Sequence, residues 1–371
     1  MRSLLRAGLA LGLITAACGK DSPAPTDFED PAAITANLAA ADSAFDSDVF
    51  RSFNAATLFV DAAAPAAPQL TSTVVGELRP KLARAGAQMV LPTLERSRRL
   101  QALLPQLSAA SAAGLLIPDS LYNRVFQWDT ATNQYTWTGT TTTGLTGIRF
   151  ELYAVDLAGT VLEPVTQIGT LDIIDQSVGS TARLRVLVRD LSAVTYVDYL
   201  ATVSGTETSA TISVEGSISN GLADPDNKTL TFDQTFAVTQ TGVRINATFT
   251  LNNPALTVTL IESLGFDDPN IVVDVDFRIA QPGETIRMAG RITITDLEQV
   301  TGTFTVYRNG GPVASISGDL SDPATQWVDA GGEPLTLADR AALDALFDAM
   351  DAFVLVVTGF FAPITTFGGG V

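Results

Sequence analysis

Residues 271–294 read IVVDVDFRIAQPGETIRMAGRITI, and their alternation of apolar and polar side chains decides the fold class. From 271 to 279 every second residue is apolar, and the same period of two resumes after Pro282-Gly283. A period of two is typical of β-strands with one buried face and one solvated face, and Pro-Gly is a turn signal. The stretch therefore predicts an antiparallel β-hairpin.

The register of this hairpin follows from its turn. Centring the turn on Pro282-Gly283 gives three apolar pairs on one side: Ile279 with Ile286, Phe277 with Met288 and Val273 with Ile292. On the other side Asp274 faces Arg291. An exposed cross-strand ion pair of this kind contributes little stability, so it indicates the register and not a site.

The same alternation continues on both sides of the hairpin. It recurs at residues 148–154, 184–188, 212–218, 245–251 and 304–306. Clusters of Asp, Asn, Pro and Gly separate these runs at intervals of about 10–14 residues, the spacing typical of turns between strands. Residues 118–334 are therefore predicted to form an antiparallel meander of roughly ten or more strands.

Helical patterns flank the predicted meander. Asp30-Pro31 is a helix start signal, and residues 31–117 are predicted to form a helical N-terminal region. Thr336 and Asp339 resemble a capping box, and a broad apolar face follows within 335–364. The predicted fold is mainly β: a curved sheet or half-barrel, with N-terminal helices and a C-terminal amphipathic helix packed on its apolar face.

The N-terminus indicates export. Arg2 and Arg6 precede an apolar run too short to span a bilayer, which is the layout of a signal peptide over residues 1–17. Thr15-Ala16-Ala17-Cys18 resembles the lipobox of bacterial lipoproteins, although that family usually has Leu where Thr15 stands. The resemblance implies that Cys18 is lipidated and that residues 18–30 are the tether. An ordinary signal peptide with an incidental cysteine is the alternative.

The resemblance also implies a cellular location. Gly19, not Asp, follows Cys18, so the inner-membrane retention signal of enteric lipoproteins is absent and an outer-membrane location in the bacterial cell envelope is expected. The partners expected are the membrane, through the lipid anchor, and either a hydrophobic ligand or an envelope protein.

Composition excludes several classes of function. The 371 residues include no histidine and one cysteine, which removes Ser-His-Asp catalysis, histidine zinc ligands and any thiolate besides Cys18. The formal net charge of −18 opposes binding to nucleic acid. We therefore expect no enzyme activity, no cofactor and no resident metal.

Two loops and one acidic pair are weak candidate sites. Residues 224–227 and 267–270 combine Asp, Pro and Asn, which suits either calcium or, more simply, Asx turns. Asp274 and Asp276 could form a carboxylate pair for acid–base chemistry, but both are predicted on the solvent face beside arginines.

An aromatic group and a basic segment each allow two interpretations. Trp128, Tyr135 and Trp137 are predicted to cluster across a hairpin, where they stabilise the sheet or, less often, form a ligand platform. Residues 79–99 contain six of the 22 basic residues, and they form either a solvated face or a contact with anionic lipid.

Two functions remain. The first is a non-enzymatic envelope lipoprotein that binds a hydrophobic or lipid ligand between sheet and helix; its layout resembles the lipoprotein-carrier half-barrels of the bacterial periplasm, without a shared motif. The alternative is a structural lipoprotein whose sealed core docks an envelope partner. A carboxylate hydrolase would need two buried acids in one cleft, and the sequence indicates no such pair.

Overall fold

The computed structural model describes residues 94, 116–156, 160–206, 208–267, 270–295, 299–344 and 346–347. Several predicted segments lie outside these residues. They are the signal peptide, Cys18 and the tether, almost all of the N-terminal helices with the basic segment, and the last part of the C-terminal helix.

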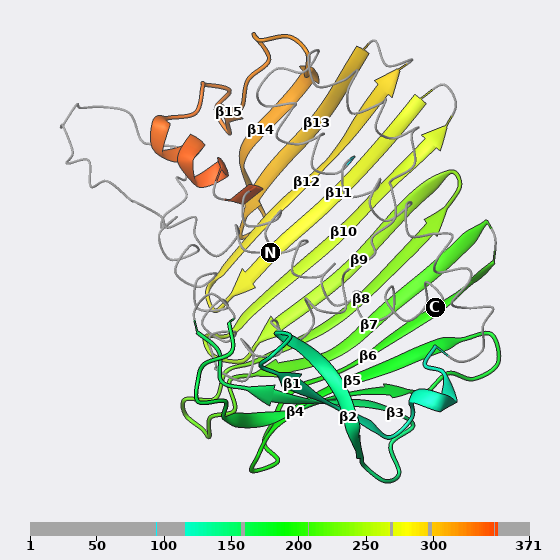
Figure 1. Ribbon diagram of the computed structural model, residues 1–371. Coiled ribbons are helices and arrows are strands. Elements are labelled where there is room, and N and C mark those ends of the chain that lie inside the picture. Colours follow the sequence, from blue (N-terminus) through cyan, green and yellow to red (C-terminus); the bar gives the residue numbers. More distant parts are fainter. Residues whose placement is uncertain are drawn as a thin grey trace.

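The described chain forms one open, curved sheet (Figure 1). A short 3-10 turn, η2 (Asp119–Leu121), precedes fifteen strands: β1 (Arg124–Asp129), β2 (Gln134–Thr141), β3 (Gly147–Tyr153), β4 (Gln167–Asp175), β5 (Ala182–Asp190), β6 (Thr195–Thr206), β7 (Ser209–Ser219), β8 (Thr229–Thr239), β9 (Gly242–Leu251), β10 (Leu256–Asp267), β11 (Asn270–Gln281), β12 (Glu284–Thr295), β13 (Gln299–Arg308), β14 (Gly311–Asp319) and β15 (Val328–Asp329). From β3 to β15 each strand pairs antiparallel with its neighbours in the chain. The predicted mainly antiparallel sheet is therefore confirmed.

The hairpin of β11 and β12 has the predicted register. Ile279 pairs with Ile286, Phe277 with Met288, Val273 with Ile292 and Asp274 with Arg291. The turn needs Gly283, whose φ of +84° is in the left-handed region that other residues rarely adopt. The period-two pattern therefore determined which side chains face each other.

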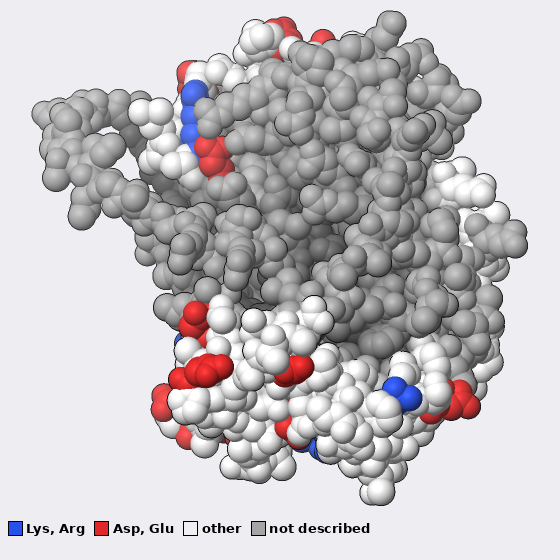
Figure 2. Space-filling view, in the orientation of Figure 1, with Lys and Arg blue, Asp and Glu red and all other residues white. Residues whose placement is uncertain are grey.

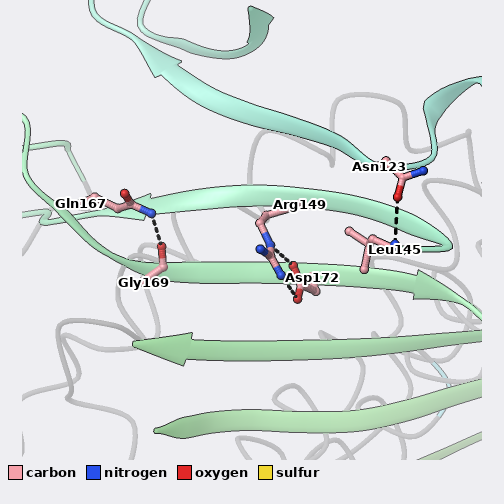
Figure 3. Close-up of polar contacts among 6 residues, drawn as sticks. All are labelled: Asn123, Leu145, Arg149, Gln167, Gly169 and Asp172. Carbon is pink, nitrogen blue, oxygen red and sulfur yellow. Dashed lines mark hydrogen bonds and ion pairs between the residues drawn. The ribbon is translucent and has the colours of Figure 1, made fainter. Parts of the chain in front are cut away.

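The first strands depart from a simple meander. The expectation of purely antiparallel pairing is wrong here, because β1 pairs in parallel with β3 and the sheet order ends β3-β1-β2. Asn123 explains this return of the chain. Its backbone N–H donates to the carbonyl of Gly147, and its Oδ1 accepts the N–H of Leu145 at 2.9 Å (Figure 3). These bonds hold the loop after β2 so that β3 begins beside β1.

One face of the sheet carries the hydrophobic core. On β9 the buried residues are Val243, Ile245, Ala247, Phe249 and Leu251, all at most 4% exposed. Equivalent residues of neighbouring strands join them in one continuous apolar cluster. Glycine has a packing role in this face: a Cβ at Gly290 would lie 2.4 Å from Cγ of Phe304, which is directly opposite in the register. The missing side chain therefore makes room for the aromatic ring.

Residues 337–344 and 346–347 are helical, directly after the predicted capping residue Thr336. The N–H of Asp339 donates to Oγ1 of Thr336, and this hydroxyl donates to the Asp339 carboxylate, so the predicted cap is confirmed. The Phe347 ring lies 6.3 Å from that of Trp327, the residue before β15. This part of the helix therefore lies at the β15 edge of the sheet (Figure 1). Within the described residues, no helix has the length and hydrophobicity needed to cross a membrane.

Candidate functional site

The apolar face of the curved sheet is the main candidate site. Register places its side chains in rows that run across the strands. One row contains Phe236, Ile245, Val275, Phe304 and Ile316, with Glu262 of β10 and Gly290 of β12 between them. The five apolar side chains of this row are all at most 5% exposed. Such a surface is complementary to hydrocarbon, whether that is another part of the protein or a ligand.

Gln234 interrupts this apolar face. It lies on β8 between Phe232 and Phe236, opposite Val214 of β7 and Ala247 of β9. Its side chain is fully buried, and among the described residues neither its Nε2 nor its Oε1 has a hydrogen-bond partner. Burying an amide without partners costs about 1–3 kcal/mol by mutational measures. Its presence here therefore needs a physical reason.

Glu262 is a second polar residue on the same face. It lies on β10 opposite Ile245 and Val275 and is 1% exposed. Gln234 and Glu262 are two strands and two residues apart in the register, which corresponds to about 12 Å between Cα atoms. Sequence reasoning missed both, although each occupies a position where the period of two predicts an apolar residue.

Asp175 holds the chain where it enters the sheet. Its Oδ2 accepts the N–H groups of Leu116 and Ile117 at 2.7 and 2.8 Å, and its Oδ1 accepts the N–H of Ser177. Leu116 and Ile117 are themselves buried. The carboxylate therefore satisfies buried backbone groups and has a structural role.

The opposite face carries charged residues in cross-strand pairs. Arg149 of β3 donates to both oxygens of Asp172 on β4 at 2.6 and 2.7 Å (Figure 3). These hydrogen bonds raise the pKa of Arg149 above its ordinary value. Asp172 is only 4% exposed, so the guanidinium replaces the water that its carboxylate loses on burial.

Asp274 and Asp276 lie on this polar face, as predicted. Asp274 is paired with Arg291 and Asp276 with Arg287, each through two hydrogen bonds. Both carboxylates are also partly exposed. Their geometry is that of structural ion pairs, and it does not place the two acids together in a cleft.

The predicted aromatic cluster forms only in part. Trp128 pairs with Tyr135 across β1 and β2, with ring centroids 5.4 Å apart. Burial raises the pKa of Tyr135 above its ordinary value, with smaller contributions from Tyr153 and Glu151. The inclusion of Trp137 was wrong: it is 42% exposed and its ring is covered by the guanidinium of Arg124 at 4.0 Å.

The loop at 224–227 is held by amide side chains. Asn227 donates to the carbonyl of Leu222, and Asn253 of the neighbouring loop donates to the carbonyl of Pro225. Residues 268–269 and the Asp267 side chain are outside the described part of the chain. Within that part, no cluster of three or more acidic residues has metal-binding geometry.

Among the charged side chains on the described surface near the first strands, acidic ones prevail. In the view of Figure 2, the lower region that contains β1–β4 shows more Asp and Glu than Lys and Arg. This agrees with the formal charge of −18 for the whole chain.

A groove lies on the polar face over β10–β13. It is lined by Thr259, Ile261, Asp276, Arg278, Thr285, Arg287, Tyr307, Asn309 and Gly310, and has a volume of about 780 Å³. It is on the opposite side of the sheet from Gln234 and Glu262, so the described residues form two separate candidate sites.

Comparison with known proteins gives no assignment. No protein-family model, no curated protein and no solved structure matches this chain. The functional argument therefore rests on the residues and their geometry.

Proposed function

We propose that this protein is a non-enzymatic lipoprotein of the bacterial cell envelope, anchored through Cys18, that holds a hydrophobic ligand with a polar group against the apolar face of its sheet. The C-terminal helix packs on that face in this proposal and closes the ligand site. The outer membrane is the proposed location.

The observation that supports a bound ligand is the fully buried amide of Gln234. A purely structural core gains stability if such a residue is replaced by Leu, because its two polar atoms have no partners in the part of the chain that the structure describes. A ligand that presents a carbonyl or hydroxyl group to this amide, and hydrocarbon to Phe232 and Phe236, would satisfy both kinds of surface.

The alternative is a structural lipoprotein with a sealed core that docks an envelope protein. The extent of burial favours it: Phe236, Val273 and Ile292 are fully buried. A core packed to this degree without cargo would need no ligand.

Native mass spectrometry distinguishes the two functions. Residues 19–371 would be exported without lipidation, purified without detergent, and weighed before and after denaturing extraction. The carrier proposal predicts an extra mass that leaves as an amphiphile. A bare polypeptide mass that stays unchanged after addition of envelope lipid extract would contradict it and favour the sealed core.

Two variants sharpen this measurement. Gln234→Leu is expected to lose most of the bound mass, whereas Asp233→Asn, one residue away on the polar face, should keep it. Equal amounts of bound ligand in both variants would show that Gln234 does not contribute to ligand binding. The anchor is tested on the full chain by the mass of its mature N-terminal peptide, which should begin at a diacylglyceryl-modified Cys18 and disappear in Cys18→Ala.

A further inference from the structure

The polar face has a second candidate site, independent of the proposed cargo. At the groove described above, Arg278 of β11 lies directly opposite Arg287 of β12. Like charges directly opposite each other on antiparallel strands destabilise a sheet. This pair therefore calls for a negative charge nearby.

Asp276 supplies only part of that charge. Both of its oxygens accept hydrogen bonds from Arg287, at 2.8 Å from Nε and 2.7 Å from Nη2. Arg278 is exposed, and the part of the chain that the structure describes gives it no ion pair. Two guanidinium groups and one carboxylate line the groove, so it has a net charge of +1 within a chain of charge −18.

The remaining lining supplies donors and an apolar wall. Oδ1 of Asn309 accepts the N–H of Thr285 at 2.8 Å, and the N–H of Asn309 donates to the carbonyl of Thr285. These two bonds fix the Asn309 side chain and leave its Nδ2 as the group that can donate to a ligand. Tyr307 lies 5.7 Å from the Arg287 guanidinium, and Ile261 is 41% exposed. The wall is thus suited to the organic part of a ligand.

We propose that this groove binds an oxyanion, a phosphate or carboxylate group attached to a small organic body, with Arg278 as its main anchor. Guanidinium groups bind such oxyanions through two parallel hydrogen bonds. The Tyr307 ring and Ile261 contact the organic body, so an organic phosphate binds more tightly than inorganic phosphate.

The first experiment measures binding of phenyl phosphate, benzoate and inorganic phosphate to the protein by calorimetry at low ionic strength. We expect phenyl phosphate to bind more tightly than inorganic phosphate, and its affinity to fall as salt is added, because the site is open to solvent. No binding of either organic anion would overturn the proposal.

Variants locate the site. Arg278→Gln is expected to weaken phenyl phosphate binding about tenfold or more, because it removes the positive charge and at least one of the two charge-assisted hydrogen bonds. Arg278→Lys should give an intermediate loss, since it keeps the charge without the paired donors. Far-UV circular dichroism verifies that both variants are folded.

Arg244→Gln is the matched control. Arg244 is also an exposed arginine without an ion pair among the described residues, but it faces Ala237 and Ser263 and does not line the groove. Its replacement should leave the affinity unchanged. Equal weakening in Arg244→Gln and Arg278→Gln would mean non-specific attraction and overturn the proposal.

A final arm separates two sources of the oxyanion. Phosphatidylcholine vesicles with and without phosphatidic acid are added to the protein that carries bound phenyl phosphate. Release of phenyl phosphate by the phosphatidic acid vesicles alone identifies a lipid headgroup as the ligand class. No release identifies a soluble organic anion.

Discussion

The two faces of the sheet treat polar groups in opposite ways. On the polar face, charged residues form cross-strand pairs, such as Arg149 with Asp172 and Arg291 with Asp274. On the apolar face, Gln234 is fully buried and has no hydrogen-bond partner within the described residues. Charged groups thus pair with each other on the polar face, whereas on the apolar face Asp175 is satisfied by backbone N–H groups and the Gln234 amide is not. The difference teaches that Gln234, and not the more numerous charges of the other face, is the residue that needs a functional explanation.

The largest effect is expected from a truncation within the apolar face. Phe249→Ala should lower the free energy of unfolding by about 3–5 kcal/mol, because a 1% exposed ring is replaced by a cavity. Thr250→Ala, the next residue on the polar face, should cost less than about 1 kcal/mol. Urea denaturation of both variants tests this, and similar losses would contradict the assignment of the faces.

A smaller effect is expected within the polar face. Arg149→Ala should cost about 1.5–3 kcal/mol, because it leaves the nearly buried Asp172 without its two charged donors. Arg291→Ala should change stability much less, since its side chain is 66% exposed. The comparison uses thermal and urea unfolding. An equal loss of stability in both variants would show that the burial of an ion pair does not determine its contribution to stability.

Replacement of the unsatisfied amide should stabilise the ligand-free protein. Gln234→Leu is expected to raise the free energy of unfolding by about 1–3 kcal/mol, since it removes from an apolar site two polar atoms that no described residue satisfies. Gln127→Leu is the contrast and should be destabilising, because Gln127 bonds to Glu151 and Thr138. A loss of stability in Gln234→Leu would contradict the view that the amide is unsatisfied without cargo.

The smallest effect concerns pH. Burial raises the pKa of Tyr199 on the apolar face above its ordinary value of 10.0. Above pH 10 the unfolded chain therefore releases this proton while the folded chain keeps it, so stability falls as pH rises, by at most about 1.4 kcal/mol per pH unit. Tyr199→Phe should reduce this slope in urea titrations between pH 9 and pH 11. A residual slope is expected, since burial also raises the pKa values of Tyr135 and Tyr153. An unchanged slope in the variant would contradict the prediction.

Much of the sheet could be predicted because its strands and turns are specified by residues close together in the sequence. Alternation and the Pro282-Gly283 turn were enough to give the register from Val273 to Ile292, which the structure confirms. The parallel pairing of β1 with β3 could not be predicted, since it depends on Asn123 bonding to residues more than twenty positions away. A period of two contains no information on such a return of the chain.

The candidate sites were less accessible to sequence reasoning. In the sequence, Gln234 and Glu262 are visible as exceptions to an apolar pattern. Only the structure shows that both side chains are buried in the apolar face. The pairing of Arg278 with Arg287 follows from the same register as Ile279 with Ile286, yet the groove around them needs β10 and β13 in place. Cys18 lies outside the described residues, so its lipidation stays a prediction.

The consecutive order of the strands has a consequence for how the protein folds. From β3 to β15 every pairing joins strands that follow each other in the chain, often across a turn of two residues between paired ends, as between Gln281 and Glu284. Short closures cost little chain entropy, so each strand can add to the one before it as a hairpin. We expect the sheet to assemble progressively along the chain, at a rate high for a β protein of this size, with the β1–β3 contact as the step that waits for distant residues to meet.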